Sequence, residues 1–226
     1  MILFVHIPKC GGKSFRSGLE QAYNDELVLH YNNPLKKHPI HNAVPVFIRH
    51  NIKKMMGRLV NVESAKLIYG HYCFDDFPEL IKDQSTLCGA FFRDPIEWLG
   101  SYLFYMQQKH MKDIKPEHII KHIKKNQLDK GYALFLGSLK VDSLDYIGIV
   151  EDYENSLKLY KSITGVDILP HYINQTQNAP KSYKQYFMDQ GVLQDVFNIM
   201  EENIEIYQQA LKRYSSLKKE YKVQPN

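Results

Sequence analysis

Residues 4–15 read Phe4-Val5-His6-Ile7-Pro8-Lys9-Cys10-Gly11-Gly12-Lys13-Ser14-Phe15. The apolar beginning predicts a buried strand, the paired glycines predict a tight turn, and the residues from Lys13 onward predict a helix. Glycine turns without a Cβ clash, and an α-helix leaves its first N–H groups without an internal acceptor. The unit therefore predicts a backbone cradle for an anion, to which Lys9 and Lys13 add charge. A phosphate or a sulfate is the expected ligand.

The end of this stretch matches part of the Walker pattern Gly-x4-Gly-Lys-Ser/Thr through Gly12, Lys13 and Ser14. Ile7 stands where that pattern has its first glycine, and Pro8 after it has no N–H to donate. The match is therefore incomplete. A phosphate loop of another kind is favoured over that of a nucleotide kinase.

The stretch from His6 to Phe15 resembles the 5′-phosphosulfate loop of sulfotransferases that use 3′-phosphoadenosine 5′-phosphosulfate (PAPS). The resemblance is to the carbohydrate 2-O-sulfotransferase branch and its bacterial relatives. It implies a catalytic role for Lys9 at the leaving oxygen. It also leaves open whether Lys9 or Lys13 makes that contact, because Cys10 and Lys13 stand where threonine is usual. The cofactor-binding residues that it implies are Lys9, Cys10, Gly11, Gly12, Lys13, Ser14 and Phe15.

A second informative segment is Arg93-Asp94-Pro95, with Ser101 further along. A strand over residues 86–92 would deliver Arg93 to the carboxyl edge of a parallel sheet, where open α/β sheets bind ligands. In the resembled family an Arg-Asp-Pro segment and a later serine bind the 3′-phosphate of the cofactor, which implies that role for Arg93 and Ser101. The alternative is an ordinary start of a helix, with Arg93 paired to a surface carboxylate.

The segment Ile68-Tyr69-Gly70-His71 runs from an expected strand into Gly-His. Histidine has an ordinary pKa of about 6.5, so it can accept a hydroxyl proton near neutral pH. The resemblance implies that His71 is the general base of a 2-O-sulfotransferase-like enzyme. The alternative is a loop histidine that only forms hydrogen bonds. His6, inside the first strand, is predicted to be buried and structural.

Residues 174–186 resemble the loop that closes over the cofactor in the same family. Lys181, Ser182 and Tyr183 would offer a charge, a hydroxyl and an aromatic face to a phosphate and to adenine. An exposed basic loop is the alternative. Glu151 is interpreted as a solvated acid at the start of a helix, with orientation of His71 or of a substrate hydroxyl as its alternative role.

The alternation of strands and helices predicts an α/β fold, of the three-layer P-loop type, with a central and mainly parallel sheet flanked by helices. With 226 residues, 44% of them hydrophobic, residues 1–226 are expected to form a single sulfotransferase domain. Asp94 as N-cap and Glu97 in a capping box mark one helix start. The expected strands cover residues 2–6, 27–31, 65–69, 86–92 and 146–150, and the expected helices cover 13–24, 47–59, 94–110, 153–164 and about 192–221.

The composition limits the partners. A net charge of +4 is too small to indicate nucleic-acid binding, and three cysteines without metal-ligand spacing indicate neither zinc nor a disulfide framework. No apolar run reaches the length of about 18 residues that a membrane span needs. A cytoplasmic protein without a membrane span is expected. The apolar face of residues 192–221 predicts core packing, with a homodimer as the lesser alternative.

The resemblance at residues 6–15, 70–71 and 92–101 implies a sulfotransferase that moves a sulfuryl group from PAPS to an acceptor hydroxyl, with 3′,5′-ADP as product and no metal. The resemblance favours a glycan or a glycolipid as the acceptor. One alternative is a P-loop nucleotide-dependent kinase, which would need Mg²⁺. The other is a non-catalytic nucleotide-binding module that keeps the anion cradle without the base.

Overall fold

A five-stranded sheet forms the centre of the computed structural model, which describes residues 1–36, 65–110, 115–170 and 180–223. Its order is β2-β3-β1-β4-β5, and every neighbouring pair is parallel. All carboxyl ends therefore lie at one edge, as expected for the predicted α/β class. All five predicted strands are confirmed, with the bounds β1 (Ile2–Val5), β2 (Leu27–Leu29), β3 (Leu67–Gly70), β4 (Leu87–Phe92) and β5 (Tyr146–Ile149).

Helices cover both faces of this sheet. In β4, Phe91 packs against Phe15 of α1 at 5.0 Å between ring centroids, whereas the next residue, Phe92, packs against Tyr132 of α7 at 5.5 Å. Because successive side chains of a strand point to opposite faces, α1 and α7 lie in different layers. The helices are α1 (Gly12–Tyr23), α4 (Pro78–Lys82), α5 (Pro95–His110), α6 (Ile119–Lys125), α7 (Gly131–Leu136), α8 (Tyr153–Thr164), α9 (Tyr183–Asp189), α10 (Leu193–Ile199) and α11 (Glu201–Glu220).

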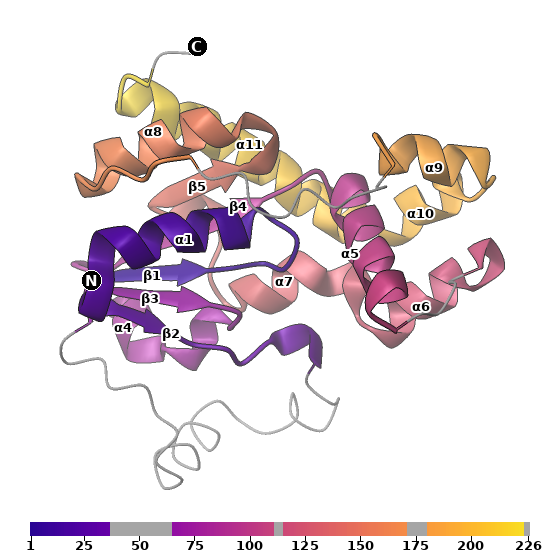
Figure 1. The fold of residues 1–226 in the computed structure, drawn as a ribbon, viewed down its shortest axis with the longest axis horizontal. Helices are drawn as coiled ribbons and strands as arrows, with labels where there is room; N and C mark the ends of the chain where they lie inside the picture. The colour runs from indigo at the N-terminus through magenta and orange to yellow at the C-terminus, as the bar shows by residue number, and fades with distance from the viewer. Residues whose placement is uncertain (37–64, 111–114, 171–179, 224–226) are drawn as a thin grey trace, which may run out of the picture.

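The helices are unevenly distributed around the sheet. Figure 1 shows α5, α6, α9 and α10 grouped beyond the end toward which the strand arrows point, while α8 and α11 pack at β5. The loops that leave the strands at this end therefore face a separate group of helices. The expected helix at 47–59 lies outside the described residues.

The start of α5 follows the sequence prediction only in part. Asp94 Oδ1 accepts hydrogen bonds from the N–H groups of Ile96 and Glu97, at 2.9 and 3.1 Å, so the N-cap is confirmed. The capping box is wrong, because the N–H of Asp94 donates to Glu151 Oε1 at 3.0 Å instead of to Glu97. Glu151 also accepts a hydrogen bond from the hydroxyl of Tyr207, at 3.2 Å. Glu151, which follows β5, therefore accepts the hydrogen bond that the capping box assigned to Glu97.

The predicted helix at 192–221 is two helices, α10 and α11, which meet at Met200. Asn203, fully buried in the first turn of α11, accepts a hydrogen bond from Tyr132 N and donates to the carbonyl oxygens of Leu128 and Asp129. These bonds tie the start of α11 to the chain ahead of α7, so packing rather than a local breaker ends α10. The apolar face of α11 is buried within the chain, as predicted.

Candidate functional site

The backbone between β1 and α1 turns through two residues with positive φ. Lys9 and Gly11 both have φ of 69°. Cys10, between them, is buried, and its N–H donates to the carbonyl oxygen of Ile7 at 3.2 Å. A left-handed backbone costs a non-glycine residue on the order of 1–3 kcal/mol, and such strain concentrates at ligand sites. The conformation of Lys9 is therefore the first structural indication of a site here.

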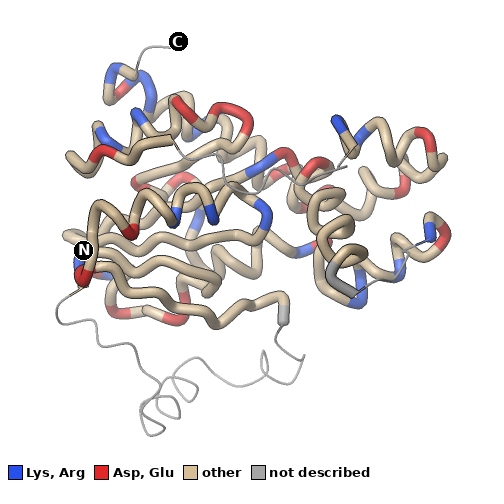
Figure 2. Tube along the Cα trace, in the orientation of Figure 1, with Lys and Arg blue, Asp and Glu red and all other residues tan. Residues whose placement is uncertain are grey.

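This turn ends at the N-terminus of α1. Gly11 is the N-cap and supplies no side-chain oxygen, and the first internal bond runs from Phe15 N to Gly11 O at 3.2 Å. The N–H groups of Gly12 and Lys13 precede that bond, at the positive end of the helix dipole. Figure 2 shows basic positions on the turn and along the first turns of α1. The turn thus has the backbone form that the predicted cradle requires, and the binding of an anion to it stays a prediction.

Four of the predicted cofactor residues, unlike the lysines, offer no side-chain group to a ligand. Phe15 is fully buried, and its ring packs on Phe4 at 4.8 Å. Cys10 is also fully buried, and burial raises the pKa of its thiol. Gly11 and Gly12 have no side chain, while Ser14 is partly exposed. Cys10 and Phe15 therefore shape the turn from within the core.

Cationic side chains meet around this turn. Arg93 Nη1 donates to the carbonyl oxygen of Lys9 at 3.5 Å, and Lys9 Nζ lies 4.8 Å from the ring centroid of Tyr105. Burial lowers the pKa of Lys9, and the charges of Arg93 and Lys13 lower it further. Within the described residues, no carboxylate forms an ion pair with these three cations. Mutually repelling cations without an acidic partner indicate a site for an anion.

Two aromatic residues that the sequence reasoning missed hold this turn in place. Trp98 Nε1 donates to the carbonyl oxygen of Pro8 at 2.7 Å, and the hydroxyl of Tyr132 donates to the carbonyl oxygen of Arg93 at 2.5 Å. Both rings are fully buried. Buried Trp and Tyr need a partner for their polar atoms, and here that need fixes the backbone of the site. The sequence carries no signal for which carbonyl each would meet.

Ser101 and Tyr183 lie with Arg93 beside the turn. Ser101 is buried in α5, and Tyr183 begins α9. Burial raises the pKa of the Tyr183 phenol, while the charge of Arg93 and a hydrogen bond with the Ser101 side chain oppose that rise. Arg93 and Ser101, the two residues predicted to bind the 3′-phosphate, therefore both lie near the ring of Tyr183, which belongs to the segment 174–186.

Glu97 organises the start of α9. Its carboxylate accepts hydrogen bonds from the Ser182 hydroxyl at 2.9 Å and from the N–H groups of Tyr183 and Lys184 at 3.2 Å each. Ser182 is also the N-cap of α9, and Lys181 is exposed. Residues 171–179 of the predicted closing loop lie outside the described residues. Ser182 is thus already engaged within the protein.

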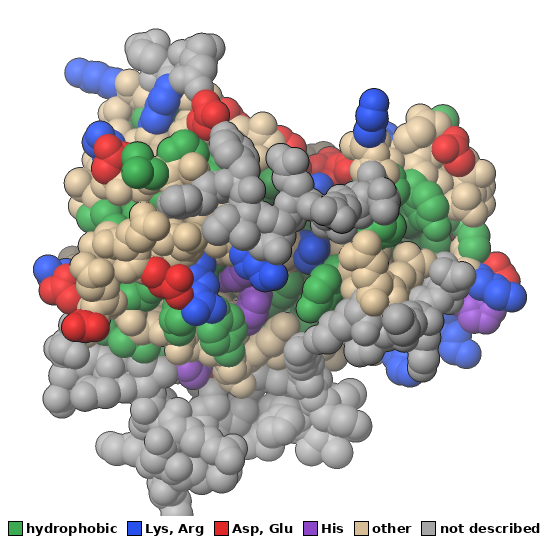
Figure 3. Space-filling view, viewed as in Figure 1, with side chains coloured by type: hydrophobic (Ala, Val, Ile, Leu, Met, Phe, Trp, Pro, Cys, Tyr) green, Lys and Arg blue, Asp and Glu red, His purple; other side chains and the backbone are tan. Residues whose placement is uncertain are grey.

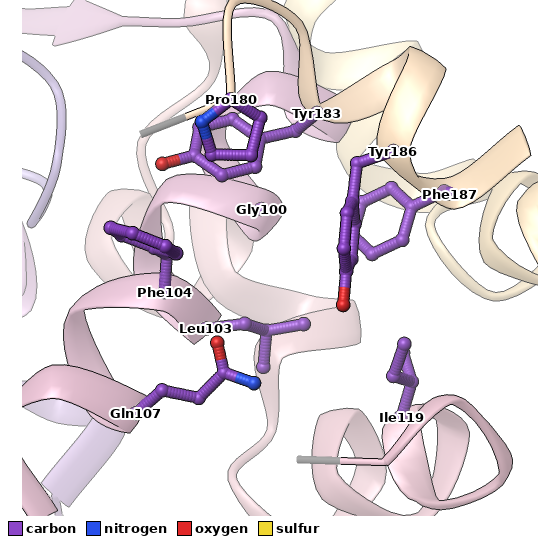
Figure 4. A pocket seen from close by; sticks show the side chains of 9 residues that line it. All are labelled: Gly100, Leu103, Phe104, Gln107, Ile119, Pro180, Tyr183, Tyr186 and Phe187. Atoms are coloured by element: carbon purple, nitrogen blue, oxygen red, sulfur yellow. The ribbon is translucent and has the colours of Figure 1, made fainter. Parts of the chain in front are cut away.

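A cavity of about 240 Å³ adjoins Tyr183, between α5, α6 and α9. Figure 4 shows aromatic rings from α5 and α9 around it, with Gln107 and the hydroxyl of Tyr186 as polar groups. An apolar wall with few polar groups is typical of small-molecule pockets. The lining residues are Gly100, Leu103, Phe104, Gln107, Ile119, Pro180, Tyr183, Tyr186 and Phe187.

His71 lies at the end of β3 and stacks on His6 at the end of β1, with ring centroids 4.3 Å apart. His71 Nδ1 is 2.6 Å from the carbonyl oxygen of His6. A carbonyl can only accept, so Nδ1 carries the proton, and in the neutral ring the lone pair is on Nε2. His71 is partly exposed. On the face of the molecule drawn in Figure 3, histidine side chains lie beside Lys and Arg side chains around a hollow near the middle.

His6 is buried, as predicted from its place in the first strand. Its ring stacks on Tyr69 at 5.3 Å as well as on His71. Burial, helped by the charges of His71 and Arg16, holds the pKa of His6 well below its ordinary value, so the ring is neutral. A Cβ at Gly12 would lie 1.6 Å from His6 Nε2, so only glycine fits there. The His6 ring thus packs between Gly12, at the start of α1, and the ring of His71.

No family model matches the chain, and no curated protein matches it. Among solved structures, the chain is similar to a sulfotransferase from Alicyclobacillus acidocaldarius, with 11% sequence identity and a TM-score of 0.44 over 90% of this chain and 95% of that one.

Within the described ranges, no helix is long and apolar enough to cross a membrane. In the same part of the chain, no group of three or more His, Cys, Asp or Glu side chains is arranged to hold a metal ion.

Replacement of the two glycines of the turn by alanine should have unequal costs. The Cβ of Gly11→Ala makes only ordinary van der Waals contact, 3.8 Å from the nearest side-chain atom, so the cost comes from its positive φ and is about 1–2 kcal/mol. Gly12→Ala overlaps the His6 ring, so we expect it to lower the free energy of unfolding by about 3 kcal/mol or more. Urea unfolding measures both. His6→Ala in the Gly12→Ala background should restore part of the loss; equal costs for the two glycines would contradict this packing.

Proposed function

We propose that this chain is a sulfotransferase that uses PAPS as donor and an acceptor hydroxyl as substrate. The observation that carries the proposal is the cluster of Lys9, Lys13 and Arg93, which has no acidic partner among the described residues and surrounds the N-terminus of α1. A ligand with several negative charges would complete it. His71 beside the same turn supplies a base.

The residues present fit the two anionic ends of PAPS. The turn from Lys9 to Ser14 offers lysine charge and helix N–H groups to the 5′-phosphosulfate. Arg93 and Ser101 offer a guanidinium and a hydroxyl to the 3′-phosphate. Tyr183 is near Arg93 and Ser101 and also lines the apolar cavity. We assign this cavity to the adenine ring of PAPS. Lys181 and Ser182 remain candidates from the closing loop.

When bound, PAPS supplies the activated sulfuryl group. His71 Nε2 takes the proton from the acceptor hydroxyl, since its tautomer leaves the lone pair on that atom. Lys9, which is partly buried, stabilises the negative charge that develops on the leaving phosphate oxygen, together with the N–H groups at the start of α1. Lys13 is exposed, so we assign it to cofactor binding. The proposal includes no metal.

The resemblance of the loop, Gly-His and Arg-Asp-Pro segments to carbohydrate 2-O-sulfotransferases favours a glycan or a glycolipid as the acceptor. A cytoplasmic location belongs to the same proposal. The kinase and the non-catalytic module remain the competing functions. A kinase would prefer ATP with Mg²⁺ to 3′,5′-ADP, and a non-catalytic module would bind 3′,5′-ADP without turnover.

The first prediction concerns the nucleotide. Without Mg²⁺, 3′,5′-ADP should stabilise the protein against heat well beyond 5′-AMP at the same concentration, because its second phosphate has a site of its own. Arg93→Ala should remove most of that difference, measured by the shift in Tm. Arg213→Ala is the control, because Arg213 bonds to the carbonyl oxygen of Leu144 away from the turn. Equal shifts with both nucleotides would exclude a separate 3′-phosphate site.

The second prediction separates the two lysines. Lys9→Ala should lower kcat by roughly 10²-fold or more, the usual loss for one preorganised donor at a developing oxyanion. Lys13→Ala should act mainly on the KM for PAPS. Initial rates with labelled PAPS measure both constants. The opposite pattern would transfer the leaving-group contact to Lys13.

The third prediction concerns the base. His71→Ala should lower turnover by about 10²–10⁴-fold and leave 3′,5′-ADP binding nearly unchanged, because the base acts on the acceptor. The acceptor proton can pass only to the unprotonated imidazole. Wild-type kcat should therefore fall as the pH is lowered, and this acidic limb should disappear in the variant. Near-normal turnover with the same acidic limb would assign the base to another residue.

A further inference from the structure

Tyr31 stands beside His71 with its ring half exposed. The exposed fraction of Tyr31 is 50%, and the Tyr31 and His71 ring centroids are 5.2 Å apart at 60°. The backbone fixes this position, because the N–H of Asn32 donates to the carbonyl oxygen of His71 at 2.6 Å. A large aromatic surface is thus held open next to the proposed base.

Arg16 holds the Tyr31 ring from the side of α1. Arg16 Nη1 donates to the Tyr31 hydroxyl at 2.8 Å, and the guanidinium carbon lies 5.9 Å from the ring centroid. Arg16 Nε and Nη2 each contact Glu20 Oε1 at 2.7 Å. The charge of Arg16 is therefore balanced by Glu20, while a guanidinium has further N–H groups to offer. The result is an exposed aromatic surface with a charge-paired guanidinium as a hydrogen-bond donor at its rim.

The position of the acceptor follows from the base. The reacting hydroxyl must lie within about 3 Å of His71 Nε2, so the rest of the acceptor must rest on the neighbours of His71. His6 covers one face of the His71 ring and is itself buried. Among the residues that the structure describes, Tyr31 is an exposed aromatic neighbour of His71. A rigid aromatic ring offers contact area at low cost in conformational entropy.

We propose that Tyr31 and Arg16 form the acceptor subsite and that its ligand is an uncharged sugar ring. The C–H face of the ring would lie on Tyr31, with ring hydroxyls accepting from Arg16. The balance between Arg16 and Glu20 gives no preference for an acidic sugar. The assignment of this surface to an acceptor rests on the proposed sulfotransferase function.

The test is saturation-transfer NMR on the full chain with 3′,5′-ADP present. Neutral methyl hexopyranosides and the matching methyl hexuronates are the probes. We expect the neutral sugars to bind, Tyr31→Ala to weaken them roughly 10-fold, and Tyr31→Phe, which keeps the ring, to weaken them less. Tyr221→Ala is the control, since Tyr221 is an exposed tyrosine at the far end of α11. It should change nothing.

Three results would overturn the subsite: no neutral sugar binds, Tyr31→Ala binds sugars as tightly as wild type, or the hexuronates bind 10-fold better than the neutral sugars. Titration of 3′,5′-ADP into matched samples without nucleotide separates this failure from that of the proposed function. Nucleotide binding without sugar binding removes the subsite alone. Sugar binding through Tyr31 without nucleotide binding keeps the subsite and removes the sulfotransferase assignment.

Discussion

The parallel register that sets Val5 beside both Gly70 and Ala90 is the constraint on which the site depends. In that register the residues that follow, His6 and His71, leave adjacent strands at the same level, so their rings stack. The chain of β4 ends at the same edge and brings Arg93 to the carbonyl of Lys9, from 84 residues away in sequence. A slip of one residue would turn these side chains to opposite faces. The pairing of these three core strands therefore also sets the geometry of the candidate site.

Buried aromatic residues hold the backbone of the turn between β1 and α1 in place. Trp98 and Tyr132 bond to carbonyl oxygens on either side of the cationic cluster, at Pro8 and Arg93. The mutual repulsion of the cations opposes their grouping, and the strained backbone of Lys9 adds to that cost. A protein tolerates such costs where the surrounding structure over-determines the local conformation. An anion bound here would relieve the repulsion.

The strands and the glycine turn before α1 were predictable because their signals are local. Apolar runs, the paired glycines and the Asp94 cap each act within a few residues, and the structure has all three. The break at Met200 and the engagement of Glu97 with α9 were not predictable, because both depend on partners distant in sequence. The roles of Trp98 and Tyr132 were missed for the same reason. The roles assigned to Lys9, His71, Arg93 and Ser101 are still predictions.

The carbonyl oxygen and the ring of His6 place different constraints on which residues can occupy position 6. Its carbonyl oxygen, which sets the tautomer of His71, would be supplied by any residue at that position. Its ring, in contrast, fills the space against Gly12. Evolutionary change at position 6 is therefore compatible with the hydrogen bond to His71, but a larger residue at position 12 requires a smaller one at position 6. Related sequences should show these two positions varying as a pair, with glycine at 12 wherever an imidazole or a larger ring stands at 6.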